Sequence, residues 1–245
     1  MFLSLVCPDQ RQHRGAHPAD RVLFAPERVP TLRTAATELC WLLTRGYQIK
    51  SALKLVGDRH SLTERQRLAL ARAACSDQSL THRSETCVPL ERLCGERVVI
   101  DGFNLMITLE AALSGGLLLL CRDGCLRDLA SVHGSYRSVQ ETERAVNLIG
   151  ATLATLGVGS AQWLLDRPVS NSGRLAVKIR TAAEQHGWTW QVELPFNPDA
   201  VIQAAAAIAL TSDSTVLDGV ARWTNLTPHL CAQAQLELWL IDLRV

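Results

Sequence analysis

The sequence predicts an α/β domain with a mostly parallel β-sheet, preceded by a small all-helical domain. After residue 95, short apolar runs alternate with segments of helical periodicity, which is typical of the strands and helices of a parallel sheet. Before residue 76, apolar residues recur at steps of three and four, which indicates helices. The predicted organisation has four parts: a disordered lead at 1–26, a basic helical domain at 27–75, a linker at 76–95 and the α/β domain at 96–245.

Length and charge fit this division. The chain has 245 residues, of which 47% are hydrophobic and 20% charged, enough for one α/β domain of about 150 residues and a smaller companion. Residues 27–72 carry nine Lys and Arg against four Asp and Glu, a balance of +5, whereas residues 97–245 carry eleven against fourteen, a balance of −3. This asymmetry suits a protein that holds an anionic polymer and cuts it at a bound cation, although ordinary scatter explains it equally well.

Cysteine usage and hydropathy indicate the compartment. The eight cysteines include no CxxC pair, so neither a structural zinc site nor a disulfide framework is expected. We interpret most of them as small buried hydrophobic residues in a reducing compartment. The first residues lack the basic start of an export signal, and the longest strongly apolar stretch elsewhere, Leu117 to Cys121, is too short to cross a membrane. We therefore expect a cytoplasmic protein without a membrane span.

Three helices are predicted in the basic domain. The first stops at Gly46, the second covers Ile49 to Val56, and the third follows a capping box formed by Ser61 and Glu64. Six basic residues of this domain would form either a phosphate-binding face or an ordinary solvated surface: Arg45, Lys50, Lys54, Arg59, Arg65 and Arg67.

The first strand of the α/β domain lies in RVVIDGFN. Its run Val98 to Ile100 suits a strand buried on both faces, and the run ends at Asp101. A carboxylate at the exit of a buried strand must be hydrated, hydrogen-bonded or held against a cation. Asp101 is therefore either the cap of the next helix or a member of a site.

Three later apolar runs also close on an aspartate. QWLLD ends at Asp166, WQVELPFNPD at Asp199 and AIALTSD at Asp213. If these runs are parallel strands, their carboxyl ends share one edge of the sheet with Asp101, where open α/β sheets place their ligands. The repetition favours a site over four separate caps.

The remaining elements follow from periodicity and turn signals. Helices are expected over Asn104 to Leu113 and over Ser138 to Leu156, and Asp123-Gly124 joins two short strands, 117–121 and 125–129, in a hairpin. Further elements are expected as helices over 174–186, from 198 and from 214, and as an edge strand within 236–243.

One loop between these elements is rich in small polar residues. In PVSNSG, residues 168–173, the hydroxyl and backbone N–H groups of Ser170, Asn171 and Ser172 would grip a phosphate at the start of the next helix. A plain turn with an N-cap explains the loop nearly as well.

Four gathered carboxylates require compensation. Two of them about 5 Å apart repel by roughly 3 kcal/mol at an effective dielectric constant of 20. Protonation relieves this repulsion, but a divalent ion is the usual solution, and hard oxygen ligands favour Mg²⁺ or Mn²⁺. Such an ion activates water and orients a phosphodiester. No GxxxxGK loop, G-x-S-x-G elbow or second aspartate two residues after Asp101 supports other hydrolytic chemistries.

The series IDGFN, LLD, NPD and TSD resembles the acidic series of the PIN and NYN nuclease superfamily. The two-part layout is similar to a prokaryotic group, domain-of-unknown-function family 434, through LCWLLTRGYQIKSALKLVGDRHSLTERQRLALARA, VVIDGFNLMITLEAALSGG, DGCLRDLASVHGSYR, LLDRPVSNSG and TSDSTVLD. The resemblance implies a PIN-like, Rossmann-like three-layer fold. It also implies four metal-facing acids with Mg²⁺ or Mn²⁺, namely Asp101, Asp166, Asp199 and Asp213.

The same resemblance places Asn104 and Ser212 nearby as hydrogen-bonding partners. The insertion 115–137 departs from a minimal PIN pattern, and its Arg127 either binds substrate or braces a hairpin by pairing with an aspartate. Glu110 is left open between a site acid and a helix-surface residue.

The leading hypothesis from the sequence is a metal-dependent ribonuclease or RNA-processing enzyme. The alternative is a non-catalytic nucleic-acid-binding or scaffold protein whose acids serve as caps. A third possibility is the hydrolysis of a small phosphorylated metabolite in the same acidic pocket.

Overall fold

The computed structural model describes residues 13–15, 17–130 and 134–245. Its main sheet has five parallel strands in the order β5-β4-β1-β6-β7, so the predicted α/β fold with a mostly parallel sheet is confirmed. The strands are β1 (Arg97–Asp101), β4 (Ser160–Leu164), β5 (Trp190–Glu193), β6 (Ile208–Leu210) and β7 (Trp223–Thr224).

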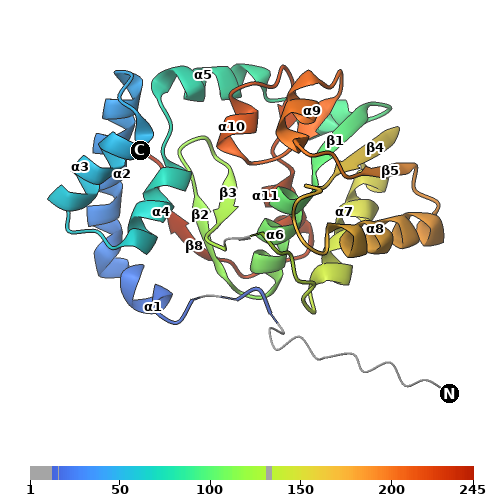
Figure 1. Ribbon diagram of the computed structural model, residues 1–245, viewed down its shortest axis with the longest axis horizontal. Helices are drawn as coiled ribbons and strands as arrows, with labels where there is room; N and C mark the ends of the chain where they lie inside the picture. Colours follow the sequence, from blue (N-terminus) through green and yellow to red (C-terminus); the bar gives the residue numbers. More distant parts are fainter. Residues whose placement is uncertain (1–12, 16, 131–133) are drawn as a thin grey trace.

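Helices cover both faces of this sheet and make three layers (Figure 1). Successive residues of β1 point to opposite faces, so Val98 and Ile100 pack in one core and Val99 packs in another. One face is covered by α6 (Gly102–Leu113), α7 (Thr142–Thr155), α8 (Ser172–His186) and α11 (Leu226–Gln233), and the other by α9 (Pro198–Ala204) and α10 (Ser214–Leu217).

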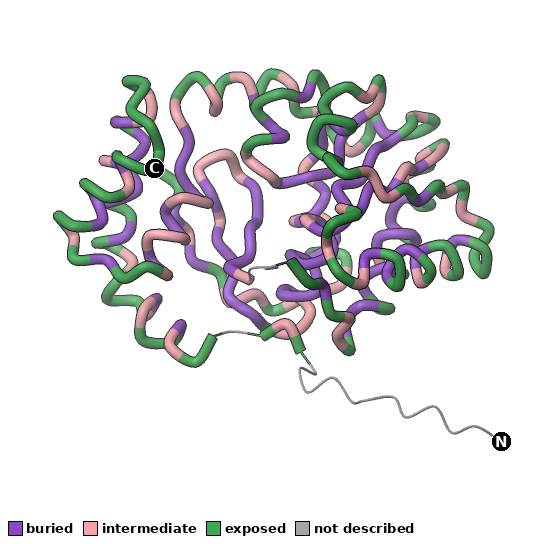
Figure 2. Tube along the Cα trace, viewed as in Figure 1, coloured by how far each residue is buried: buried purple, intermediate pink, exposed green. Residues whose placement is uncertain are grey.

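A second sheet of three strands stands between the main sheet and the N-terminal helices. It contains β2 (Leu117–Leu120), β3 (Leu126–Asp128) and β8 (Trp239–Asp242), in the order β3-β2-β8. The first two form the predicted antiparallel hairpin, and β8 is the predicted edge strand, paired parallel to β2. Leu118 packs toward α6, whereas Leu119 packs toward the N-terminal helices, so one small sheet joins the two parts. Figure 2 shows most of β2 and β3 in the colour of buried residues.

The N-terminal helices form a bundle whose leucine and alanine core continues into one face of the second sheet. The capping box of its third helix uses Thr63 and Gln66 in place of the predicted Ser61 and Glu64. The second helix continues beyond its predicted end at Val56 to Arg59. Gly57 lies within it, and a Cβ added there would lie 2.4 Å from the Arg67 guanidinium. The bundle contains α2 (Val29–Thr44), α3 (Ile49–Arg59) and α4 (Glu64–Ala73), preceded by a 3-10 helix at Pro26–Arg28.

The structure differs from the predicted disordered lead at 1–26. Residues 1–12 and 16 lie outside the described residues, but the end of this segment forms α1 (Asp20–Leu23). The Asp20 carboxylate is fully buried and accepts hydrogen bonds from Nε and Nη2 of Arg65. A salt bridge between distant residues, which local composition does not reveal, orders this segment.

The predicted linker at 76–95 also contains regular structure. It forms α5 (Asp77–Thr86) and a 3-10 helix at Leu90–Leu93. The segment packs against the edge of the main sheet, since Nε1 of Trp223 donates a hydrogen bond to the Arg83 carbonyl at 2.8 Å. In this helix Arg83 is the one buried residue, so its sequence is mostly polar and resembles a linker. None of the helices in the described ranges has the length and apolar character that a membrane crossing requires.

Buried charges fix the hairpin to its surroundings. The carboxylate of Asp123 accepts hydrogen bonds from Arg83 at 2.6 Å and from Arg127 at 2.6 and 3.0 Å, and all three side chains are buried. Burial acts to raise the pKa of Asp123, but the two guanidinium groups outweigh it and hold the pKa below its usual value. The network ties the hairpin to α5.

Replacing Asp123 by Asn should destabilise the protein by about 3–5 kcal/mol, because two buried guanidinium groups would lose their shared counter-charge. Urea unfolding measures this loss. The matched control is Asp58→Asn, whose half-exposed carboxylate pairs with Lys54 and Arg67, and it should change stability much less. Equal effects of the two substitutions would contradict the proposed role of the network.

Candidate functional site

The four predicted aspartates lie at the carboxyl edge of the main sheet. Asp101 is the last residue of β1, Asp166 follows β4 by two residues, and Asp213 follows β6 by three. Asp199 lies in the first turn of α9, after β5. The chain runs from β1 outward to β4 and β5, then returns to β6 on the other side of β1. Asp101 and Asp213 therefore flank the switch point, where open α/β sheets bind ligands.

Asp101 is buried in the centre of this edge, with only 8% of its surface exposed. Its Oδ2 accepts a hydrogen bond from Thr211 Oγ1 at 2.8 Å, and its Oδ1 accepts one from the Asn104 N–H at 3.4 Å, which caps α6. Gly102 permits the tight turn into this helix, since an added Cβ would lie 2.8 Å from the Leu164 carbonyl oxygen.

The surroundings of Asp101 disfavour its charged form. Burial raises its pKa to about 7, the Thr211 hydrogen bond opposes the rise, and the charges of Asp213 and Asp199 add to it. A carboxylate with this pKa is half protonated near neutral pH, so a bound cation would restore its charge at little cost.

Asp213 is joined to Asp101 through Thr211. The Thr211 hydroxyl accepts a hydrogen bond from the Asp213 N–H at 3.0 Å and donates one to Asp101. Oδ1 of Asp213 accepts from the N–H groups of Thr215 and Val216 and caps α10. In the described ranges no hydrogen bond is made to Oδ2 of Asp213, which is available to a ligand. Thr211 is not among the site residues predicted from the sequence. The signal that could have identified it is a hydroxyl residue between a strand and a predicted site acid.

Asp166 and Asp199 are linked to the pair electrostatically. Partial burial raises the pKa of Asp166, and the charge of Asp199 adds to the rise. Partial burial also raises the pKa of Asp199, and the charge of Asp213 adds to it. The charges of neighbouring carboxyl groups thus influence one another along the strand ends.

The geometry limits how a metal ion would be held. Among the described residues, no group of three or more His, Cys, Asp and Glu side chains is arranged to hold a metal ion. Mg²⁺, however, is usually bound by one or two carboxylates together with waters and substrate phosphates. Asp101 and Asp213 fit this partly hydrated mode, and the four acids do not form a closed cage.

Asn104 and Ser212, which the sequence places near the site, are hydrogen-bonded to each other. Oδ1 of Asn104 accepts hydrogen bonds from the Ser212 N–H at 2.8 Å and from the Ser212 hydroxyl at 2.9 Å. This arrangement joins the start of α6 to the loop after β6. Asn104 also lines the adjoining hollow.

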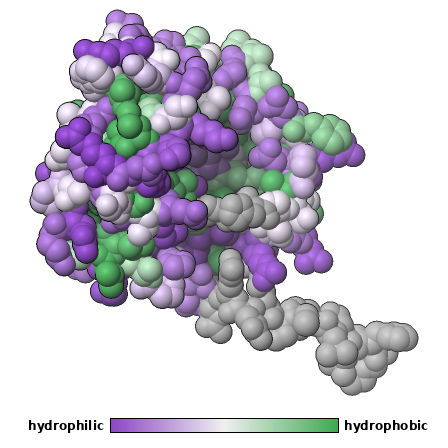
Figure 3. All heavy atoms as spheres, turned by 60° about the vertical axis from the view of Figure 1, so that its left-hand side comes forward, coloured by the Kyte–Doolittle hydropathy of each residue, from purple (hydrophilic) through white to green (hydrophobic). Residues whose placement is uncertain are grey.

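A hollow of about 330 Å³ adjoins Asp213. It lies between the helical bundle and the α/β part. On the face of the molecule drawn in Figure 3, hydrophilic residues predominate. The polar lining of the hollow comes from four elements and one loop, namely Arg72, Asn104, Thr108, Arg127, Asp128, Ser212, Asp213 and Ser214. Both parts of the chain therefore contribute to the same concave surface.

Arg127 braces this surface, which corrects its prediction as a substrate-binding residue. Its guanidinium makes four hydrogen bonds within the protein: two to Asp123, one to the Ser212 carbonyl at 2.6 Å and one to the Arg72 carbonyl at 3.0 Å. The pairing with Asp123 is the alternative that the sequence left open. By holding the Ser212 carbonyl, Arg127 positions the loop that leads to Asp213.

Glu110 is neither a site acid nor a surface residue. Its side chain is fully buried and accepts hydrogen bonds from the Tyr136 hydroxyl, from Thr142 Oγ1 at 2.7 Å and from Arg14 Nε at 2.5 Å. Both alternatives for Glu110 are therefore wrong. Its partners lie far away in sequence, so the spacing along α6 could not reveal them.

The loop with Ser170, Asn171 and Ser172 is held by the segment 134–136. Asn171 adopts a left-handed backbone conformation, and its Nδ2 donates a hydrogen bond to the Tyr136 carbonyl at 2.9 Å. Ser170 pairs with the same segment through its backbone, and Ser172 is buried in the first turn of α8. These contacts support the turn interpretation, and phosphate binding by the loop stays a prediction.

The basic residues of the helical bundle do not form a free cationic face. Lys54 pairs with Asp58 at 2.7 Å, and Arg67 pairs with the same carboxylate. Arg59 pairs with Glu38, Arg65 with the buried Asp20, and Arg45 stacks on Trp41. Of the six predicted residues, Lys50 alone makes no such pair within the described part of the chain. Four of the six predicted residues are therefore engaged in ion pairs within the described part of the chain.

Comparisons with known proteins place the chain among relatives. A family model described as a domain of unknown function, DUF5616, matches residues 90–229, and one described as a protein of unknown function, DUF434, matches residues 31–85. The chain is 30% identical over 187 residues to "Uncharacterized protein MJ0935" of Methanocaldococcus jannaschii, a match that covers 76% of this chain and 89% of the relative. No solved structure matches significantly. The predicted resemblance to family 434 is confirmed.

The raised pKa of Asp101 predicts how stability depends on pH. Between about pH 4 and about pH 7, the folded protein retains a proton on Asp101 that the unfolded chain releases, so the free energy of unfolding should fall as pH rises through this window. A rise in pKa from 3.8 to about 7 corresponds to about 4 kcal/mol. Asp101→Asn, which is uncharged at every pH and also caps helices well, should lose most of this dependence.

Urea unfolding in EDTA, at a series of pH values, tests this expectation. At about pH 8 the Asp101→Asn protein should be the more stable of the two. Stability curves that run parallel for the variant and the wild type would show that Asp101 does not titrate in this window.

Proposed function

This chain belongs to the family described as domain of unknown function DUF5616, and we propose that it is a divalent-metal-dependent ribonuclease or RNA-processing protein. The observation that carries the proposal is the buried Asp101 beside Asp213, at the switch point of a parallel sheet. The proposal includes a PIN-like identity for the α/β part, which the order of the four strand-end acids supports.

In this proposal, Asp101 and Asp213 hold Mg²⁺ or Mn²⁺. Such an ion, when bound, supplies an activated water molecule and neutralises charge on a phosphodiester. Thr211 orients the Asp101 carboxylate through its hydrogen bond at 2.8 Å and fixes the Asp213 backbone at the same time. A hydroxyl that orients a metal-binding carboxylate typically contributes about 10–100-fold to metal affinity or activity.

The other polar groups bind the substrate and transfer protons. Asp166 and Asp199 have raised pKa values and stand further toward solvent, so they are suited to accept and return a proton. The Asn104 amide donates to a phosphate oxygen from the wall of the hollow. Arg72, on the bundle side of the hollow, pairs with Asp128 at 3.2 Å and donates a hydrogen bond to the Ala130 carbonyl, so it shapes the wall of the hollow.

The second candidate is a non-catalytic nucleic-acid-binding or scaffold protein. The observation that favours it is that Asp101 and Asp213 both cap helices, so each carboxylate has a structural role without a metal. This candidate predicts RNA binding that weakens steeply with salt and requires no divalent ion.

Substitution of the two central acids separates the candidates. Asp101→Asn and Asp213→Asn should each lower the cleavage rate of a mixed RNA pool in Mn²⁺ by more than about 100-fold. A residue that orients a metal ligand contributes about 10–100-fold to activity, and the ligand itself contributes more. Asp58→Asn, on the surface of the bundle, serves as the control. Cleavage by either variant at the wild-type rate would exclude the mechanism.

Substitution of Thr211 gives a finer test. Thr211→Val should weaken Mn²⁺ binding by about 10–100-fold in calorimetric titration, because it leaves Asp101 without its orienting hydrogen bond. Thr211→Ser keeps the hydroxyl and should bind Mn²⁺ nearly as the wild type does. A wild-type protein that is folded and binds no Mn²⁺ would support the non-catalytic candidate.

A further inference from the structure

An exposed phenyl ring stands beside the proposed site. Phe196 exposes 72% of its surface, more than any other large hydrophobic residue in the described ranges. It lies in the loop after β5, three residues before Asp199. A single exposed apolar ring is common on protein surfaces, so the significance of Phe196 rests on its position at the strand-end edge and on the guanidinium that contacts it.

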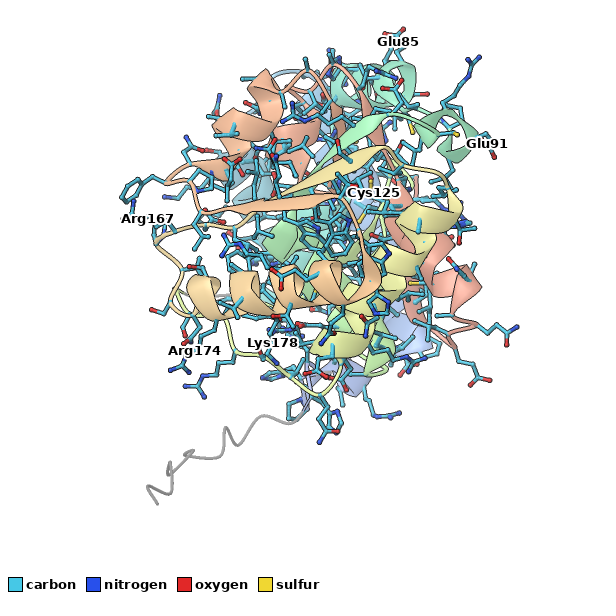
Figure 4. All side chains as sticks on the ribbon, turned by 90° about the vertical axis from the view of Figure 1, so that its right-hand side faces the viewer. Glu85, Glu91, Cys125, Arg167, Arg174 and Lys178 are labelled. Carbon is cyan, nitrogen blue, oxygen red and sulfur yellow. The ribbon has the colours of Figure 1, made fainter. Side chains whose placement is uncertain are left out.

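The ring is held in place by a neighbouring loop. The Arg167 guanidinium lies over it, with the guanidinium carbon 4.7 Å from the ring centroid. The two loops are joined by a hydrogen bond from the Arg167 N–H to the Pro195 carbonyl at 2.9 Å. Figure 4 shows Arg167 projecting outward from the molecule on the loop that precedes α8. A stacked guanidinium orders the ring before any ligand binds and leaves most of it open.

The same two loops carry two of the proposed site acids. Asp166 immediately precedes Arg167, and Asp199 follows Phe196 by three residues. The Leu165 N–H donates a hydrogen bond to the Glu193 carbonyl at 3.0 Å, which continues the pairing of the two strands up to the loops. The ring is therefore fixed at the rim of the acidic edge.

We infer that Phe196 and Arg167 form a stacking platform for an unpaired nucleobase of single-stranded RNA, whose backbone passes the strand-end aspartates. This inference rests on the proposed function. Every nucleobase has a flat π-face that stacks on an aromatic ring, and a guanidinium behind that ring also attracts phosphate. A base in a duplex is already stacked on both faces, so the platform selects single strands.

Binding and cleavage are measured separately to test the platform. A short fluorescein-labelled oligouridine is titrated with the full chain in EDTA, with fluorescence anisotropy as the readout. Phe196→Ala should weaken binding by between about fivefold and about 150-fold, the range observed for the loss of a stacked base. Phe196→Trp should retain the affinity, because a larger ring stacks equally well. Val22→Ala, at a residue of similar exposure on α1, should bind as the wild type does.

The outcomes distinguish this inference from the proposed function. If the wild type binds oligouridine and Phe196→Ala binds equally well, the platform is excluded, while metal-dependent cleavage can still be observed. If Phe196→Ala weakens binding but no RNA is cleaved in Mn²⁺, the platform stands and the nuclease proposal fails. Equal binding of a duplex of the same length, or a change in sedimentation of the free protein on Phe196→Ala, would overturn the platform in favour of shape recognition or a protein interface.

Discussion

A buried carboxylate at the end of the central strand is the constraint around which the edge of the main sheet is built. Asp101 is 8% exposed, and its surroundings raise its pKa to about 7. A buried carboxyl group is tolerated only with hydrogen-bond partners, and Thr211 and the start of α6 supply them. The same hydroxyl binds the backbone of Asp213, so satisfying one buried acid also fixes the second.

The position of this edge depends in turn on the small second sheet. One of its faces packs against α6, which begins at the site, and the other packs against the helical bundle. Arg127 extends from this sheet and donates a hydrogen bond to the Ser212 carbonyl, so it connects the buried ion network to the loop that leads to Asp213. The helical bundle therefore contributes to the site mainly through packing and through Arg72, which pairs with Asp128 at the wall of the hollow.

Capping and chemistry are compatible roles for the same carboxylates. Asp101 uses Oδ1 for its helix and Oδ2 for the Thr211 hydroxyl, whereas Asp213 caps its helix with Oδ1 alone, so each cap holds the side chain in one orientation. Helix N-termini at strand ends also contribute positive dipole ends, which partly stabilise the gathered acids. A site built in this way is preorganised by the fold itself.

The sequence by itself determined the α/β class, the hairpin and the edge that collects the four aspartates, because an apolar run that closes on an acid is a local pattern and parallel strands align their ends. Only the tertiary structure decided the roles of Arg127 and Glu110, whose partners are far away in the chain. It also revealed α5 in the predicted linker, the order of α1 and the position of Phe196 beside the acids. Burial and ion pairing depend on which residues distant in sequence come into contact, and hydrophobic periodicity does not predict those contacts.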